Sequence, residues 1–304
     1  EVDRALKRNI RGLDFLTAGR ETVGAMDKDL LWRDGTAILY RYRPLLDEIY
    51  RKPLLIVTPP SNKGYIFDLA EGQSFVEFML LRGYDVFLLD WATPRREESG
   101  LGLTHYVNHF VGESVAQVQK ATGEDEISLA GYCMGGVLTT LYAAANPDGP
   151  VSNLIAFATP IDFTEMKLFQ VWADKRHFDV DSLVDQLGII PPDLMLGAFD
   201  LARPANRTAG RLNLWTNMWN DEFVRSYRKF DRWASETLPV PGEYFRDQMK
   251  LLMWDNALLN DRFVLGEKRV TLSQITVPIL NIVAQHDHIV SHKAAQPLMT
   301  MTGR

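Results

Sequence analysis

The feature that most limits the fold of this chain is the stretch at residues 127–136, which reads Ile-Ser-Leu-Ala-Gly-Tyr-Cys-Met-Gly-Gly. A short apolar run leads into Gly-x-Cys-x-Gly, and a helix-compatible run at residues 137–145 follows it. Glycines on both sides of one reactive side chain, between a strand and a helix, are typical of a nucleophile elbow. The side chain in the nucleophile position is Cys133, the only cysteine of the chain.

This stretch has the small residues and the following helix that a nucleophile elbow requires. The nucleophile sits in a strained turn, so Gly131 and Gly135 are needed where strand and helix pass closely. The helix directs its N-terminal N–H groups and positive dipole end at Cys133, and we therefore expect a lowered thiol pKa. The alternative is a buried structural cysteine beside a pair of helix-capping glycines. The flanking strand and helix favour the nucleophile.

Apolar strands and helical patterns alternate along the first half of the chain. Strands are predicted at residues 36–42, 53–57, 86–89, 127–130 and 154–158. Helices are predicted between them, over residues 104–122 and 137–145 and in a first helix, capped by Asp68, that stops at Gly83. Continuous apolar strands joined by helical crossovers predict an α/β fold with a doubly wound, mostly parallel sheet buried on both faces.

The alternation stops between residues 162 and 259, which are helix-like and contain five tryptophans, most of them predicted to pack in a helical bundle. A short β excursion at residues 262–270 and a clear strand at residues 278–284 follow. We therefore predict an N-terminal helical segment over residues 1–28, a core formed by residues 29–161 and 260–304, and a helical cap inserted at residues 162–259. The N-terminal segment is compatible with packing on the body or on a second chain.

Composition excludes several classes of protein. The formal net charge of −6 argues against nucleic acid as a main partner. No apolar run approaches the length of about 18 residues that a membrane-spanning helix needs. A single cysteine suits a reducing cytosol, and the first residues carry no secretory signal. No dinucleotide fingerprint, phosphate-binding loop or zinc-ligand pattern is present, so neither a cofactor nor a metal is expected.

A cysteine nucleophile needs a base, and the base needs an orienting carboxylate. Asp287 is the candidate acid because it follows the strand at residues 279–284, at the sheet edge where the elbow also emerges. None of the six histidines lies on a loop after a further strand, where the base is expected. His105 and His109 are predicted to lie on the surface or to pack structurally. His286 and His288 are adjacent to Asp287 and would face away from it in extended structure, and His292 is expected to open the following helix.

The oxyanion hole is predicted to use two backbone N–H groups. One belongs to Met134, the residue after the nucleophile. The second comes from the loop after the strand at residues 53–57. Pro59 and Pro60 have no N–H to offer, which leaves Ser61 or Asn62.

Several motifs together resemble the polyhydroxyalkanoate synthases. Residues 131–136 resemble the cysteine lipase box of that family, and four further segments follow in the family's order. They are Pro-Pro-Ser-Asn-Lys-Gly-Tyr-Ile-Phe-Asp-Leu at residues 59–69, Gly-Tyr-Asp-Val-Phe-Leu-Leu-Asp-Trp at 83–91, Thr-Pro-Ile-Asp-Phe at 159–163 and Ala-Gln-His-Asp-His-Ile-Val at 284–290. The resemblance extends over about residues 35–300, and its short N-terminal part is most similar to synthases that work with a second subunit.

The resemblance implies an α/β-hydrolase fold with an inserted cap and a Cys–His–Asp triad. It implies that Cys133 accepts (R)-3-hydroxyacyl groups from coenzyme A, which is substrate and not cofactor, and passes them to a polyester chain. It further implies a homodimer, a second synthase subunit and a cytoplasmic enzyme at polyester granules. Asp287 matches the family's acid. The histidine of the family lies in a Gly-Gly-His segment, and the corresponding position is expected beyond Arg304. The 304 residues alone are therefore expected to be inactive or severely impaired.

The choice of cysteine suits acyl transfer. A thiolate attacks a thioester readily, and the acyl-cysteine stays activated for transfer to a hydroxyl. Two other functions remain open from the sequence. One is a cysteine-dependent thioesterase or polyester depolymerase of the same fold, and the other is a non-catalytic granule-associated subunit.

Overall fold

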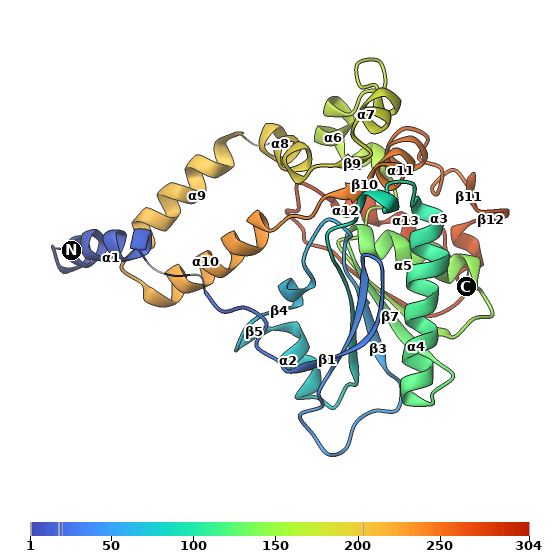
Figure 1. Cartoon of the computed structure of the whole chain (residues 1–304), viewed down its shortest axis with the longest axis horizontal. Helices are drawn as coiled ribbons and strands as arrows, with labels where there is room; N and C mark the ends of the chain where they lie inside the picture. Colours follow the sequence, from blue (N-terminus) through green and yellow to red (C-terminus); the bar gives the residue numbers. More distant parts are fainter. Residues whose placement is uncertain (1, 18, 20, 203, 304) are drawn as a thin grey trace.

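A seven-stranded sheet forms the centre of the protein in a computed structural model that describes residues 2–17, 19, 21–202 and 204–303. Figure 1 shows the sheet with helices packed around it. Across the sheet the strands follow the order β1 (Lys28–Asp34), β2 (Ala37–Tyr42), β6 (Val86–Trp91), β3 (Leu54–Val57), β7 (Ile127–Tyr132), β8 (Val151–Phe157) and β13 (Ile279–Ile282).

The sheet is mostly parallel, as predicted. Strands β6, β3, β7, β8 and β13 pair in parallel, whereas β2 runs antiparallel to β6 and forms a hairpin with β1. Strand β1 was not predicted. Its sequence, Lys-Asp-Leu-Leu-Trp-Arg-Asp, is largely charged because it lies at the edge of the sheet, where half of the strand faces solvent.

Helices cover both faces of the sheet, so it is doubly wound. On one face a long helix, built from α3 (Leu103–His105), η3 (Tyr106–Val111) and α4 (Gly112–Thr122), lies beside α5 (Met134–Ala145). Its centre is π-helical, which the periodicity of the sequence did not reveal. On the other face α2 (Phe75–Leu80) closes a smaller cluster with Leu54, Ile56 and Leu88.

The helix α2 begins differently from the prediction. Its N-cap is Ser74, whose hydroxyl accepts the Glu77 N–H, and not Asp68. Asp68 instead begins the short strand β4 (Asp68–Ala70), which pairs with β5 (Gln73–Ser74) after the 3-10 turn η1 (Gly64–Phe67). There its carboxylate accepts the Met26 N–H at 3.0 Å and the Ser74 hydroxyl at 2.8 Å. The buried carboxylate thus joins the N-terminal segment to the loop before α2.

The region predicted as a cap is largely helical. It contains a two-stranded ribbon, β9 (Ile189–Ile190) with β10 (Val240–Pro241), that the sequence did not suggest. Figure 1 shows α6, α7, α8 and α11 gathered beyond one edge of the sheet. The helical elements are η4 (Phe163–Glu165), α6 (Lys167–Trp172), α7 (Val180–Leu187), α8 (Pro192–Ala202), α9 (Pro204–Asn217), α10 (Asp221–Ser235), α11 (Gly242–Asp247) and η5 (Gln248–Trp254).

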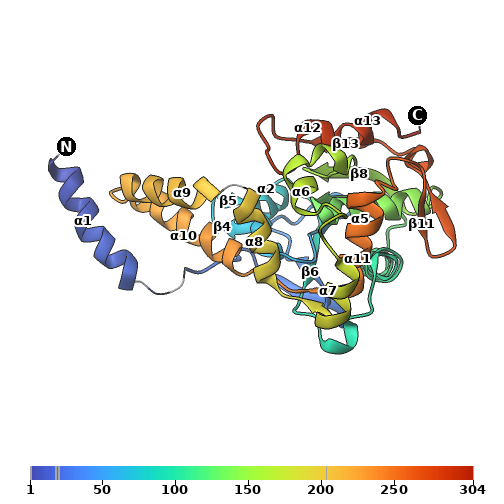
Figure 2. The same ribbon diagram turned by 90° about the horizontal axis from the view of Figure 1, so that it is seen from above.

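The N-terminal helix α1 (Val2–Thr17) packs against α9, and both project from the body together with α10 (Figures 1 and 2). The Arg4 and Arg8 guanidinium groups lie over the rings of Trp219 and Trp215, at 4.6 and 5.0 Å from the ring centres. The amphipathic pattern of the sequence therefore corresponds to one helix whose partners are cap helices of the same chain.

After the cap, the chain forms the predicted hairpin and returns to the sheet. The hairpin consists of β11 (Phe263–Leu265) and β12 (Lys268–Val270). Strand β13 ends at Ile282, two residues before its predicted end. It lies at the sheet edge, where Leu280 and Ile282 are 56% and 42% exposed. The remaining short elements are η2 (Arg96–Glu98), η6 (Leu272–Gln274), α12 (His292–Ala295) and α13 (Pro297–Thr300). Among the described residues no helix is both long and apolar enough to cross a membrane.

Candidate active site

Cys133 occupies the turn between β7 and α5 in a backbone conformation that is unusual for a residue with a side chain. Its φ is 51° and its ψ is −117°. Such a conformation is strained and persists only where the surroundings enforce it. The Cys133 N–H donates to the Phe157 carbonyl at 2.9 Å, and the Cys133 carbonyl accepts the Val137 N–H at 3.1 Å. Neighbouring strand and helix therefore hold the elbow on both sides.

The glycines around Cys133 are required by close backbone contacts. A Cβ atom on Gly135 would collide with the Val57 carbonyl, and one on Gly131 would collide with the Gly136 backbone. A Cβ atom on Gly136 would run into Thr159. The strand–helix approach predicted for the first two glycines thus includes the third, which lies against the loop after β8.

The prediction of a lowered thiol pKa was wrong. The pKa of Cys133 is raised to about 11, mainly by burial and to a smaller extent by the negative charge of Asp287, although the N–H of Met134 acts to lower it. Desolvation of a thiolate outweighs one helix-terminal N–H group because the charged form loses its water. At neutral pH Cys133 is therefore a protonated thiol, and its activation needs a base.

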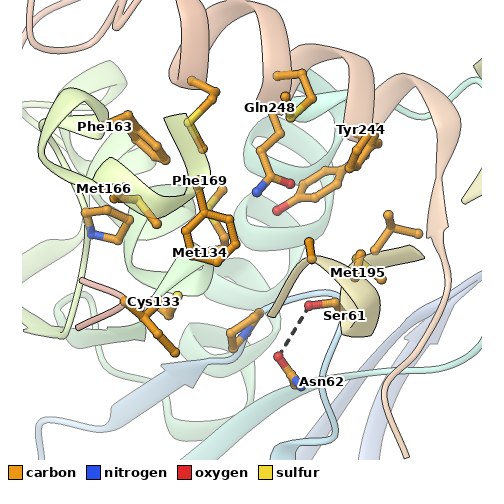
Figure 3. Close-up of a pocket in the computed structure, with 18 of the residues that line it drawn as sticks. Ser61, Asn62, Cys133, Met134, Phe163, Met166, Phe169, Met195, Tyr244 and Gln248 are labelled. Atoms are coloured by element: carbon orange, nitrogen blue, oxygen red, sulfur yellow. Dashed lines mark hydrogen bonds between the residues drawn. The ribbon is translucent and has the colours of Figure 1, made fainter. Parts of the chain in front are cut away.

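The thiol opens into an apolar pocket between the sheet and the cap. Cys133 and Met134 form part of the wall on the sheet side, and Pro59, Ser61 and Asn62 contribute the loop after β3. Figure 3 shows these groups facing cap side chains across the cavity. Most of the cap side is aromatic or thioether in character and includes Phe163, Met166, Phe169, Trp172, Met249 and Met253. Such a wall excludes water from the thiol.

The loop after β3 distinguishes the two candidates for the second oxyanion donor. The Asn62 N–H already donates to the Pro59 carbonyl at 3.0 Å. The Ser61 N–H donates to no group in the described part of the chain, while the Ser61 carbonyl accepts the Leu238 N–H at 2.7 Å. An uncommitted N–H in the wall of the same pocket as Cys133 makes Ser61 the better candidate, together with Met134.

Asp287 lies on the turn that follows β13. One of its carboxylate oxygens accepts the N–H groups of Ile289 and Val290, at 2.8 and 3.0 Å. Its charge acts on the pKa values of both Cys133 and Tyr132, so it is near the elbow. The turn fixes one carboxylate oxygen, and the other makes no hydrogen bond to the described residues. This arrangement is suited to receiving an imidazole N–H, and the assignment of Asp287 as the acid stays a prediction.

The six histidines include a contacting pair, His105 and His109. None lines the pocket around Cys133 in the described ranges. His105 and His109 contact each other with ring centres 4.7 Å apart, and the His109 Nε2 lies 2.7 Å from the Asp34 carboxylate. Burial lowers the pKa of His105, and the neighbouring His109 lowers it further. These two histidines are packing residues, and the described chain shows no cluster of metal-ligating side chains.

Two polar residues of the pocket were not predicted from the sequence. Tyr244 on α11 and Gln248 at the start of η5 point into the cavity in Figure 3. Nothing in their local sequence marks them, because a tyrosine and a glutamine four residues apart on a helix are ordinary. Only the close approach of the cap to the elbow gives them significance.

Comparisons with known proteins identify the family. Residues 5–79 match the family described as the poly-beta-hydroxybutyrate polymerase (PhaC) N-terminus, and residues 70–300 match the alpha/beta hydrolase fold family. The chain is 33% identical to the poly(3-hydroxyalkanoate) polymerase subunit PhaC of Allochromatium vinosum, over 95% of this chain and 82% of that protein.

Two further relatives carry the same name. That of Thiocystis violacea is 31% identical over 94% of this chain and 80% of its own length, and that of Haloferax mediterranei is 30% identical over 92% and 57%. The chain thus spans about four fifths of two of these relatives and little more than half of the third. It belongs to the poly(3-hydroxyalkanoate) polymerase family and has the α/β-hydrolase fold.

Proposed function

We propose that this chain carries the nucleophile of an acyltransferase that moves (R)-3-hydroxyacyl groups from coenzyme A to a growing polyester. The observation that carries the proposal is the position of Cys133, on a strained elbow that opens into an apolar pocket under the cap. Relatives named as poly(3-hydroxyalkanoate) polymerase subunits support the substrate class.

The reaction balances with a thiol and a base. In the first half, Cys133 gives its proton to the base and its sulfur attacks the thioester carbonyl carbon; coenzyme A leaves as the thiolate and takes up that proton. In the second half, the terminal hydroxyl of a polyester chain gives its proton to the base and attacks the acyl-cysteine. An ester bond forms, the thioester breaks and the Cys133 sulfur recovers a proton. Neither half of the reaction oxidises or reduces any group, so the reaction as written needs no bound cofactor.

The remaining roles belong to groups around the elbow. Backbone N–H groups of Met134 and Ser61 hold the developing oxyanion, with Asn62 as the alternative to Ser61. Asp287 orients the base, which the resemblance to the family implies is a histidine. A thiol whose pKa is about 11 reacts slowly at neutral pH without such a base.

We also propose how the enzyme is assembled. The word "subunit" in the names of the relatives supports a second synthase subunit. A homodimer, attachment to the surface of polyester granules and a location in the cytoplasm rest on the resemblance of the motifs.

The proposal is tested with the full-length protein that contains these residues and (R)-3-hydroxybutyryl-CoA. We expect release of coenzyme A with formation of polymer, and loss of both in Cys133→Ala while the circular dichroism spectrum stays unchanged. Release of free 3-hydroxybutyrate without polymer would identify a thioesterase instead.

One observation favours a second candidate, a non-catalytic granule-associated subunit. No base lies beside Cys133 in the described residues, and its thiol is protonated at neutral pH. In that case the full-length protein would release no coenzyme A but would still bind isolated polyester granules.

A further inference from the structure

The Tyr244 hydroxyl lies at the active-site pocket with its hydrogen-bonding capacity unused. Tyr244 is 2% exposed, and its hydroxyl oxygen is buried without a hydrogen-bond partner among the described residues. A buried hydroxyl in this state destabilises the fold, and buried polar groups are paired in the great majority of cases. An exception that faces a cavity points to a ligand that supplies the missing partner.

The position of the hydroxyl is fixed by its surroundings. The ring of Tyr244 lies against that of Tyr106, with ring centres 4.6 Å apart and planes inclined by 47°. At the start of α11 the Gly242 N–H donates to the Gly188 carbonyl at 2.8 Å. At its end the Asp247 carboxylate accepts the Leu103 N–H at 2.9 Å. These contacts hold the helix at both ends and the ring against Tyr106, so the hydroxyl stays at the pocket.

A second uncommitted polar group lies one helical turn further on. Tyr244 and Gln248 are four residues apart and therefore share a helix face. The Gln248 amide makes no hydrogen bond within the described part of the protein, and Figure 3 shows both groups directed into the same cavity, across from Met134. Burial raises the pKa of Tyr244 well above its ordinary value, as do Tyr106 and Cys133, so the hydroxyl keeps its proton and can donate.

The acyl group of the proposed reaction has two oxygen-bearing carbons. Its carbonyl oxygen is assigned to the backbone N–H groups at Met134 and Ser61. The oxygen at C3, a hydroxyl in the monomer and an ester oxygen in the chain, has no partner in a wall of phenylalanine and methionine side chains. A phenol and an amide can each donate to such an oxygen.

We propose that the Tyr244 hydroxyl and the Gln248 amide bind the C3 oxygen of the acyl group, and that they make the site prefer 3-hydroxyacyl thioesters over plain acyl thioesters. The inference rests on the proposed function of this site. A plain acyl group would fill the same space and leave both groups unpaired, so the site discriminates by the cost of an unmade hydrogen bond.

The test measures binding, because binding does not need the base. Calorimetry on the full-length protein with Cys133→Ala compares (R)-3-hydroxybutyryl-CoA with butyryl-CoA. We expect the hydroxylated thioester to bind more tightly, and Tyr244→Phe to reduce that preference by roughly tenfold through weaker binding of this thioester alone. Gln248→Leu should act in the same direction.

Tyr42→Phe is the matched control, since Tyr42 also has a buried hydroxyl without a described partner but does not line the pocket. Both Tyr→Phe changes remove an unpaired buried hydroxyl, so each should raise Tm by about 2 °C. Only Tyr244→Phe should alter the preference.

The outcomes distinguish a failure of the proposed function from a failure of the role given to Tyr244 and Gln248. If Cys133→Ala binds neither thioester, the proposed function fails. If it binds them and the preference survives both Tyr244→Phe and Gln248→Leu, the proposed function stands and the role of the two residues is wrong. A fall in Tm for Tyr244→Phe would mean that its hydroxyl supports the fold, which also contradicts the inference.

Discussion

At the scale of single residues, Cys133 shows a conflict between geometry and electrostatics. The elbow presents the sulfur to the pocket, yet the packing that shapes the elbow also removes water from the thiolate. A helix N-terminus offers one N–H group, that of Met134, which does not compensate for the lost solvation. The sequence motif predicts that the sulfur is presented to the pocket. It does not predict the loss of solvation, because desolvation depends on side chains contributed by distant segments.

The raised thiol pKa predicts how the 304-residue chain reacts with iodoacetamide. Because Cys133 is the only cysteine, the alkylation rate reports this thiol alone. We expect the rate to rise with pH toward about 11, whereas the urea-unfolded chain should level off above its ordinary pKa of 9.0. A plateau near pH 8 in the folded chain would contradict the assignment. A full-length protein that carries the proposed histidine base should show the rise at lower pH.

The same shift affects stability at high pH. Below the unfolded pKa the thiol is protonated in both states and contributes nothing. Between the two pKa values the unfolded chain releases a proton that the folded chain keeps, so this residue makes the folded state less stable as pH rises. Cys133→Ala should therefore flatten the fall in Tm above pH 9, as measured by thermal unfolding.

The crowded backbone at Gly135 predicts a large cost for one added methyl group. Gly135→Ala would force the helix α5 away from the Val57 carbonyl, and we expect a loss of about 3 kcal/mol or more in the free energy of unfolding. Gly197→Ala in α8 is the matched control, because nothing lies within 4 Å of its added Cβ. It should gain about 0.5–1 kcal/mol from helix propensity. Urea titration of the two variants should give shifts of opposite sign.

At the scale of elements, the buried parallel strands were the most predictable parts of the fold. Their continuous apolar runs leave few alternatives, and β3, β6, β7 and β8 appear where the sequence placed them. Edge elements were harder: β1 is charged, and the two-residue strands β9 and β10 are too short to have a periodicity. Asp68 was wrongly predicted as a helix cap, because an aspartate that caps a helix and one that joins two loops by hydrogen bonds look the same in sequence. The pocket wall from the cap could not be predicted, since it depends on how helices dock.

The ion pairs of Arg246 predict the rigidity of α11, the helix that presents Tyr244. Its guanidinium contacts Glu243 at 2.6 Å and Asp181 at 3.0 Å and also pairs with Asp185, so one cation joins α11 to α7. The carboxylates are partly exposed, and solvent screening limits the expected cost of Arg246→Ala to about 1–2 kcal/mol. Hydrogen exchange should show faster amide exchange in α7 and α11 and unchanged protection in β7.

A matched control is Arg43→Ala, which removes a fully exposed pair with Asp29 and should leave the free energy of unfolding almost unchanged. Equal effects of the two substitutions would mean that Arg246 is not a junction between the helices. High salt should reduce the difference between them.

At the scale of the whole molecule, the projecting helices α1, α9 and α10 are separate from the sheet that carries the nucleophile. The contacts of α1 with the other two helices and their connecting turn include arginine–tryptophan stacking, Arg228 over the ring of Phe15 and the Arg11–Asp221 ion pair of 2.9 Å. Such contacts hold helices together at the surface without a large apolar core. The sequence suggested an amphipathic N-terminal helix but could not identify α9 as its partner.

Removal of residues 1–19 should therefore leave the sheet intact. We expect the main Tm to change by no more than about 2 °C, because α1 does not pack on the central sheet. Trp215 and Trp219 should become more accessible, which acrylamide quenching of tryptophan fluorescence would detect. A large fall in Tm would mean that α1 supports the body as well as the cap helices.

The order of strands has a consequence for synthesis of the protein on the ribosome. From β3 outward the sheet adds β7, β8 and β13 in chain order, so the growing edge moves in one direction as the chain emerges. Between β8 and β13, however, more than a hundred residues, most of them in the cap, must be translated. At ordinary elongation speeds the edge of β8 stays unpaired for on the order of ten seconds. The nascent chain therefore passes through a stage in which Cys133 and its strand are made but Asp287, the candidate acid, is still to be added.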